Sequence, residues 1–176
     1  MRELLKIAVL LSLALAPACR NEQASSSNSN SDAAKSVTSS APAIVLAGRV
    51  TDAAEVLTPE QEATLNTKLA QLEQATKHQM VVVTVPTLGG ADIDTFTKDL
   101  GNSWGIGRED YNDGVIILIA PNERRVRIAV GYGLEKLLTH DVCKQIIDKQ
   151  MMPRFRKHDL AGGIDAGADA LIERMS

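Results

Sequence analysis

The sequence predicts an α/β fold, an α/β/α sandwich in which a small mixed β-sheet is flanked by helices. Two apolar, β-branched runs at 79–85 and 114–120 are separated by a stretch with helical periodicity. A strand, a helix and a second strand in this order favour a right-handed parallel crossover. An alternating run at 125–130 follows the short turn 121–123, which adds a hairpin and makes the sheet mixed.

The first helix is expected after Thr58-Pro59-Glu60-Gln61, which is a capping box with proline in the first turn. Leu65, Leu69 and Leu72 then recur at helical spacing to about Lys77. The remaining expected elements are a strand at 79–85, a helix at 92–104, strands at 114–120 and 125–130, and helices at 139–152 and 159–175.

Residues 1–19 are typical of a signal peptide, with a basic start, an apolar core and the small residues Ala16-Pro17-Ala18 before Cys19. The apolar core is too short to span a membrane as a helix. Two interpretations stay open: a secreted soluble protein cut after Ala18, or a bacterial lipoprotein lipidated at Cys19. The serine-rich stretch that follows favours the lipoprotein, because a cysteine before a flexible tether makes sense as an anchor. We therefore expect the protein on the periplasmic or extracellular side of a membrane.

The tether is expected over residues 20–47, because its serine, asparagine and alanine side chains bury too little apolar surface to fold. The folded domain is then expected over residues 48–176. The net charge of −3 gives no basic face for nucleic acid. The single cysteine of the domain, Cys143, lies among apolar residues at helical spacing and is expected to be a buried small hydrophobe.

Charged, glycine-rich loops flank the predicted hairpin. The start of its first strand and the end of its second lie at the same end, so the loop 105–113 and the turn 131–135 should meet. Asp110, Asp113 and Glu135 would then be neighbours, and hard cations such as calcium or magnesium bind carboxylate and carbonyl oxygens. The alternative is that Asp113 belongs only to a turn and that Glu135 only complements a helix start.

Three arginines, Arg124, Arg125 and Arg127, cluster at and just before the second strand of the hairpin and are candidate phosphate ligands. Two functions follow. A metal held by an aspartate could polarise a phosphoryl oxygen in a phosphatase. Alternatively, the domain binds a cell-envelope partner and its metal is structural, and the arginines form a solvated face. No nucleophile motif or phosphate loop of the Walker type is present, so the binding module is slightly favoured and no catalytic residue is assigned.

Four motifs in order resemble the TPM domain family: Val50 to Leu57, Trp104-Gly105-Ile106-Gly107, Asn112-Asp113-Gly114, and Val130 to Glu135. The resemblance implies an α/β/α sandwich outside the cytoplasm and, in some members, calcium at acidic loops. A plant relative in the thylakoid lumen has been described as an acid phosphatase. The resemblance also adds Asp52 to the metal candidates. We expect Trp104 to be structural, packing against the sheet.

Overall fold

The computed structural model describes residues 44–176, so the expected signal peptide, Cys19 and most of the expected tether lie outside the described residues. A four-stranded sheet has the order β1-β2-β3-β4. β1 pairs with β2, and β2 with β3, in parallel, whereas β3 and β4 form an antiparallel hairpin. The strands are β1 (Val50–Asp52), β2 (Gln79–Thr84), β3 (Gly114–Ala120) and β4 (Arg125–Val130).

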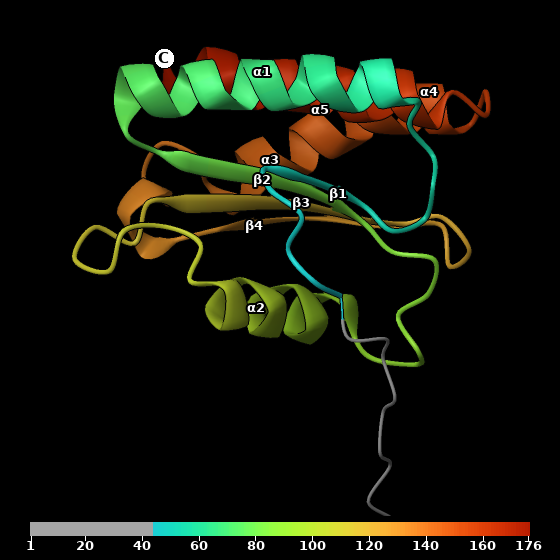
Figure 1. Ribbon diagram of the computed structural model, residues 1–176, viewed down its shortest axis with the longest axis horizontal. Helices are drawn as coiled ribbons and strands as arrows, with labels where there is room; N and C mark the ends of the chain where they lie inside the picture. The colour runs from blue at the N-terminus through green and yellow to red at the C-terminus, as the bar shows by residue number, and fades with distance from the viewer. Residues whose placement is uncertain (1–43) are drawn as a thin grey trace, which may run out of the picture. The chain divides into compact units, whose positions relative to one another are not determined.

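Helices cover both faces of the sheet (Figure 1). The face opposite α2 carries α1 (Pro59–Thr76) and α5 (Leu160–Met175), together with α3 (His140–Ile146) and α4 (Met152–Phe155). The other face carries α2 (Ile93–Trp104). The predicted α/β/α sandwich with a small mixed sheet is confirmed.

The helix ends follow from local sequence. Thr58 and Gln61 form the predicted capping box at the start of α1. Asp92 accepts hydrogen bonds from the amides of the first turn of α2, and Gly105 ends that helix with a φ of 61°. Glycine tolerates this left-handed conformation better than other residues, so Gly105 lets the chain turn sharply into the next loop.

The sheet separates two apolar cores. All seven residues of β3 are buried, as expected for a central strand covered on both faces. The larger core lies toward α1, α3 and α5 and contains Cys143, which is 6% exposed; burial raises the pKa of its thiol. Trp104 packs against the smaller core beneath α2, in agreement with the structural role expected for it.

Three features differ from the expected elements. β1 is a strand of only three residues, too short for a periodic pattern to reveal. The expected helix 139–152 continues to Phe155 through a π-helical turn, η2 (Ile147–Met151), just before Pro153. Proline has no N–H to donate to the preceding turn, and a widened turn accommodates this loss. Ile44, within the expected tether, packs against the smaller core. Across residues 44–176 no helix combines the length and apolar character needed to cross a membrane.

Candidate functional site

The loop 105–113 and the turn 131–135 meet at the amino end of β3, as the hairpin geometry predicted. The amide of Gly133 donates to the carbonyl oxygen of Asn112 at 3.0 Å. A Cβ atom on Gly133 would lie 1.9 Å from the carbonyl oxygen of Tyr111, so a larger residue could not occupy this position without moving the loop. We call these two segments together the loop end.

Asp113 is the only buried carboxylate among the described residues, with 2% of its surface exposed. Its Oδ1 accepts the amide proton of Arg108 at 2.8 Å, and its Oδ2 accepts from Arg108 Nε at 2.8 Å and Nη2 at 2.5 Å. Nδ1 of His78, which precedes β2, lies 3.4 Å from the same Oδ2. Both carboxylate oxygens are therefore engaged by groups from two segments of the chain.

These contacts set the charge of Asp113. Burial on its own raises the pKa of the carboxyl, but the hydrogen bonds from the side chain and amide of Arg108 and from His78 outweigh it. The pKa of Asp113 therefore lies below its ordinary value, and the pKa of Arg108 is raised by the same hydrogen bond. The pair stays ionised and fixes the loop 105–113 to the sheet.

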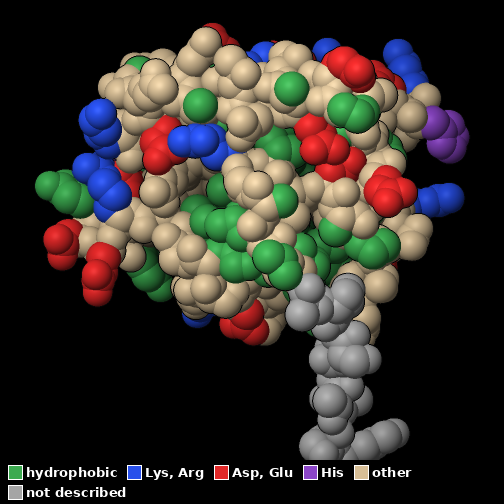
Figure 2. Space-filling model, in the orientation of Figure 1, with side chains coloured by type: hydrophobic (Ala, Val, Ile, Leu, Met, Phe, Trp, Pro, Cys, Tyr) green, Lys and Arg blue, Asp and Glu red, His purple; other side chains and the backbone are tan. Residues whose placement is uncertain are grey.

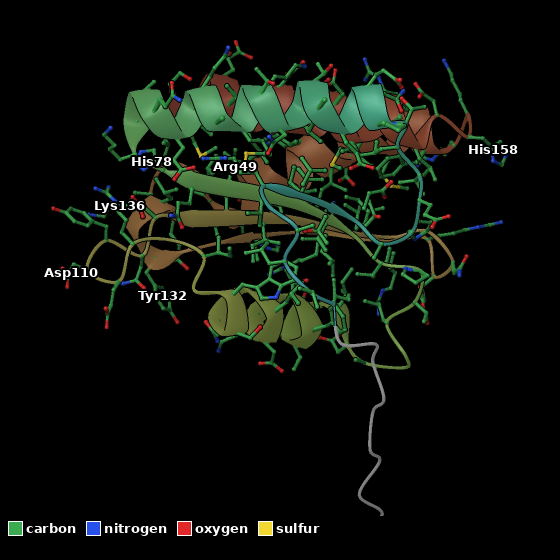
Figure 3. The ribbon with its side chains drawn as sticks, in the orientation of Figure 1. Arg49, His78, Asp110, Tyr132, Lys136 and His158 are labelled. Atoms are coloured by element: carbon green, nitrogen blue, oxygen red, sulfur yellow. The ribbon has the colours of Figure 1, made fainter. Side chains whose placement is uncertain are left out.

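Both tyrosines of the chain lie at the loop end and are exposed, Tyr111 by 60% and Tyr132 by 76%. The guanidinium of Arg108 stands 3.9 Å from the ring centre of Tyr111, a cation–π contact that holds the ring. Figure 3 shows Asp110, Tyr132 and Lys136 at the same end of the molecule as His78. The loop end thus presents aromatic and charged side chains together.

The four metal candidates do not assemble into one site. Within residues 44–176, no group of three or more His, Cys, Asp and Glu side chains is placed to hold a metal ion. Asp110 and Glu135 are exposed and share the loop end with Asp113, whose oxygens are already engaged by Arg108. As arranged, these residues do not fit a calcium cage.

Asp52 lies at the opposite end of the sheet. It pairs in register with Thr84, whereas the loop end adjoins Gln79 at the start of the same strand. At about 3.3 Å per residue, these positions are about 17 Å apart. Oδ2 of Asp52 accepts the amide proton of Leu57 at 2.8 Å, and its Oδ1 accepts from the Thr84 hydroxyl. The extended segment after β1 does not bring Asp52 back toward Asp113, and its carboxylate instead orders the loop before α1.

The three candidate phosphate ligands also separate. Arg127 lies on the face of β4 toward α2, where its Nε is 3.1 Å from Asp94 Oδ1. Arg125 shares that face by alternation. The pKa of Asp92 is lowered mainly by hydrogen bonds from the α2 amides, and the charge of Arg125 lowers it further. Arg124, in the hairpin turn, lines a cavity at the carboxyl end of β3, and Arg125 is also part of the lining of that cavity. Arg124 and Arg125 therefore share a cavity that Arg127 does not line.

Arg124 and Asp113 stand at opposite ends of β3, which is seven residues long and therefore about 23 Å. A site that combines a metal held by Asp113 with these arginines is therefore not formed, and Asp52, at the arginine end of the sheet, uses both carboxylate oxygens in local hydrogen bonds. Sequence reasoning missed Arg108, although a basic residue five positions before an aspartate in a glycine loop is a visible pattern. It also missed Arg156 and His158, which line the cavity beside Arg124 and are more than thirty residues away in sequence.

Comparisons with known proteins agree with this architecture. The family model described as TPM domain matches residues 50–174. The N-terminal domain of a protein from P. gingivalis is 35% identical with a TM-score of 0.68, covering 72% of this chain and 80% of that one. The N-terminal domain of the cg2496 protein from Corynebacterium glutamicum is 19% identical with a TM-score of 0.59, covering 78% of this chain and 85% of that one.

A third similar structure is the BA42 protein from Bizionia argentinensis, 17% identical with a TM-score of 0.60, covering 68% of this chain and 81% of that one. At these lower identities, the second and third structures are similar in fold alone. A comparison with curated proteins found no match.

Proposed function

The chain belongs to the TPM domain family, and we propose that it is a binding module for another cell-envelope protein, held at a membrane outside the cytoplasm by lipidated Cys19. The observation that carries this proposal is the pair of exposed tyrosines on the loop end. Tyrosine is enriched at protein interfaces because a rigid ring with a polar tip supplies contact area at low entropic cost.

The framework beneath these tyrosines supports the proposal. The Arg108–Asp113 pair fixes the loop that carries Tyr111. Binding a partner therefore costs little additional conformational entropy in this loop. Leu137, 42% exposed, adds an apolar side chain just after the turn that carries Tyr132. Of the five large apolar or aromatic side chains exposed in residues 44–176, three therefore lie in the loop end or next to it.

A site-specific cross-linking experiment tests the binding module. A photo-reactive amino acid is placed at Tyr132 in cells, and at the exposed Gln71 of α1 as the matched control. We expect discrete adducts at position 132 that disappear when Tyr111 is changed to Ala, and none at position 71. Equal cross-linking at both positions, or none at position 132, would contradict the proposal.

The phosphatase alternative is less well supported, because Asp110, Asp113 and Glu135 lie at the opposite end of the sheet from the arginines. Asp52 lies at the arginine end, but both of its carboxylate oxygens accept local hydrogen bonds. We expect the purified domain to leave p-nitrophenyl phosphate intact, with and without calcium or magnesium. Hydrolysis that Asp113→Asn abolishes would instead make the loop end catalytic and overturn the binding proposal.

For calcium, we propose that the ion competes with Arg108 for the carboxylate of Asp113, with Asp110 and Glu135 as further oxygen ligands. Support comes from their shared position on the two segments that meet at the loop end, and from the preference of calcium for such oxygens. Titration calorimetry should then show tighter calcium binding in Arg108→Gln than in the wild type, and none in Asp113→Asn. Unchanged affinity in Arg108→Gln would argue against competition.

The anchor is tested separately. Stable attachment requires more than one acyl chain, which a lipoprotein cysteine carries. Cys19→Ser should move the protein from the membrane pellet to the soluble fraction. A wild-type protein that is already soluble and has an unmodified mass would leave the secreted form as the better description.

A further inference from the structure

A cavity of about 470 Å³ opens at the end of the sheet opposite the loop end, between the β3–β4 hairpin and the turn that joins α4 to α5. Its apolar wall includes Ile119, Val126, Met152, Phe155 and Leu160. The cavity lies beside the carboxyl end of β3, the edge of an open α/β sheet at which ligands commonly bind. Its position and apolar lining are those of a small-molecule site.

The polar rim of the cavity is basic. Arg124 comes from the hairpin turn and Arg125 from the start of β4, whereas Arg156 and His158 come from the segment after α4. None of these four side chains forms an ion pair with an acidic residue in the described part of the chain. Figure 2 shows basic side chains above and below a histidine at the right-hand end of the molecule, where Figure 3 labels His158.

The acidic neighbours of this rim are occupied elsewhere. Glu123, next to Arg124 in sequence, accepts from the Thr87 hydroxyl at 2.6 Å and from the Leu88 amide at 2.9 Å. Asp159, next to His158, accepts the amide proton of Gly162 at 2.8 Å and caps α5. The carboxylates that stand closest in sequence are thus committed to local structure, and the guanidinium groups of the rim are left available to a ligand.

The apolar wall is held in place from behind. A Cβ atom on Gly163 of α5 would lie 2.3 Å from Cε1 of Phe155, so the ring of Phe155 packs directly on the helix backbone. Met152 begins α4 immediately after the π-helical turn, which sets the direction in which this short helix leaves the core. The wall is therefore a packed surface rather than a loose loop.

We propose that this cavity binds a phosphate monoester that carries a short apolar group. Two guanidinium groups and an imidazole match a doubly charged phosphate, which arginine contacts through paired N–H donors. The apolar group would lie against Met152, Phe155 and Leu160. This site is separate from the loop end and requires neither calcium nor the partner proposed there.

Residues 44–176 are suited to the test, because they contain the whole sheet with both cores and the similar P. gingivalis structure is of an isolated domain. Octyl phosphate is the probe, and octanol and inorganic phosphate represent its two halves. With ¹³C-methyl methionine, the Met152 signal should shift on adding octyl phosphate. The signal of Met80, buried near the loop end, should not. No shift at Met152, or equal shifts at both, would overturn the proposal.

The charge requirement is tested by the double variant Arg124→Gln, Arg156→Gln, which should weaken octyl phosphate binding about tenfold or more. The matched control Arg154→Gln, Arg174→Gln removes the same charge from residues that do not line the cavity, and should change affinity less than about twofold. Equal weakening in both would mean only a general charge effect, and octylamine binding as tightly as octyl phosphate would also overturn the proposal.

A vesicle experiment separates the two sources of such a ligand. Phosphatidylcholine vesicles with and without phosphatidic acid are sedimented with the domain. Binding that needs phosphatidic acid and is lost in Arg124→Gln, Arg156→Gln would identify a lipid headgroup. Octyl phosphate binding without vesicle binding would identify a soluble ester. Both results support the site, whereas binding to neither would overturn it.

Discussion

The two ends of the sheet differ in whether their charged side chains are paired within the fold. At the loop end, the buried carboxylate of Asp113 is paired with Arg108 and approached by His78. At the carboxyl ends of β2 and β3, Arg124, Arg156 and His158 surround an open cavity and form no ion pair among the described residues. The first arrangement uses charge to hold a loop, whereas the second leaves charge available to a ligand.

This contrast changes how acidic and basic motifs are interpreted. The aspartates of the glycine loops suggest a metal site in the sequence. The best placed of them, Asp113, is however already paired with the guanidinium of Arg108, five positions earlier. The arginines of the hairpin suggest a solvated face, yet two of them, Arg124 and Arg125, line a cavity with an apolar wall. Whether a charge is paired within the fold therefore matters more than whether its motif looks functional.

The largest effect is expected at the helix that leads into the loop end. Trp104→Ala removes a ring that packs against the smaller core, and should lower the free energy of unfolding by about 3 kcal/mol. Urea denaturation measures this loss. The exposed ring of Tyr132 is the control, since Tyr132→Ala should change stability by less than about 0.5 kcal/mol. If Trp104→Ala remained stable but no longer bound its partner, Trp104 would belong to the recognition surface instead.

The next effect concerns the contact between the two segments of the loop end. Gly133→Ala would place a methyl group on the carbonyl oxygen of Tyr111, and should cost about 2–3 kcal/mol by displacing one segment. An added methyl group at Gly105 has open space around it, so the only cost of Gly105→Ala comes from the left-handed backbone conformation. We expect this variant to lose about 1 kcal/mol of stability. Equal losses in the two variants would show that the close approach at Gly133 relaxes easily.

The fold was largely predictable from the sequence, because caps and periodicity are local. Thr58 and Gln61 mark the start of α1 by their own spacing, and the run from Gly114 to Ala120 is recognisable as a buried strand without any partner. The meeting of the loop 105–113 with the turn 131–135 followed from the geometry of a hairpin. Only β1, with three residues, gave no pattern of its own.

The candidate site was predictable only in part, since it depends on which partner a charge finds. Asp113 was identified, but its pairing with Arg108 depends on how the loop folds back. The cavity depends on Arg124 and Arg156, which lie on different elements thirty-two positions apart and meet only in the folded chain. Resemblance placed Asp52 with the loop-end acids, whereas the parallel pairing of β1 with β2 carries it to the other end.

A smaller effect should come from the ion pair itself. Asp113→Asn keeps the shape but removes the charge that accepts three hydrogen bonds from Arg108, and should cost about 2 kcal/mol at pH 7. The pKa of Asp113 is lower in the folded than in the unfolded state, so its stabilisation is complete above the ordinary value near 3.8 and is lost as the pH falls below it. Urea denaturation at several pH values should show the wild type and Asp113→Asn converging below about pH 4. A constant difference across that range would mean that charge is not the cause.

The smallest effect expected is that of calcium on thermal stability, because the ion must compete with a guanidinium already in place. Binding to the folded state alone stabilises it by RT ln(1 + [L]/Kd), which is about 1.4 kcal/mol at ten times Kd. The wild-type domain should therefore melt slightly higher in millimolar calcium than in chelator, and Asp113→Asn should lose that difference. Glu62→Gln is the matched control, because Glu62 is a partly exposed carboxylate at the start of α1, far from the loop end in the fold. Arg108→Gln should melt lower in chelator yet gain more from calcium than the wild type does. Identical melting curves in calcium and chelator for both the wild type and Arg108→Gln would leave Asp113 as the partner of Arg108 alone.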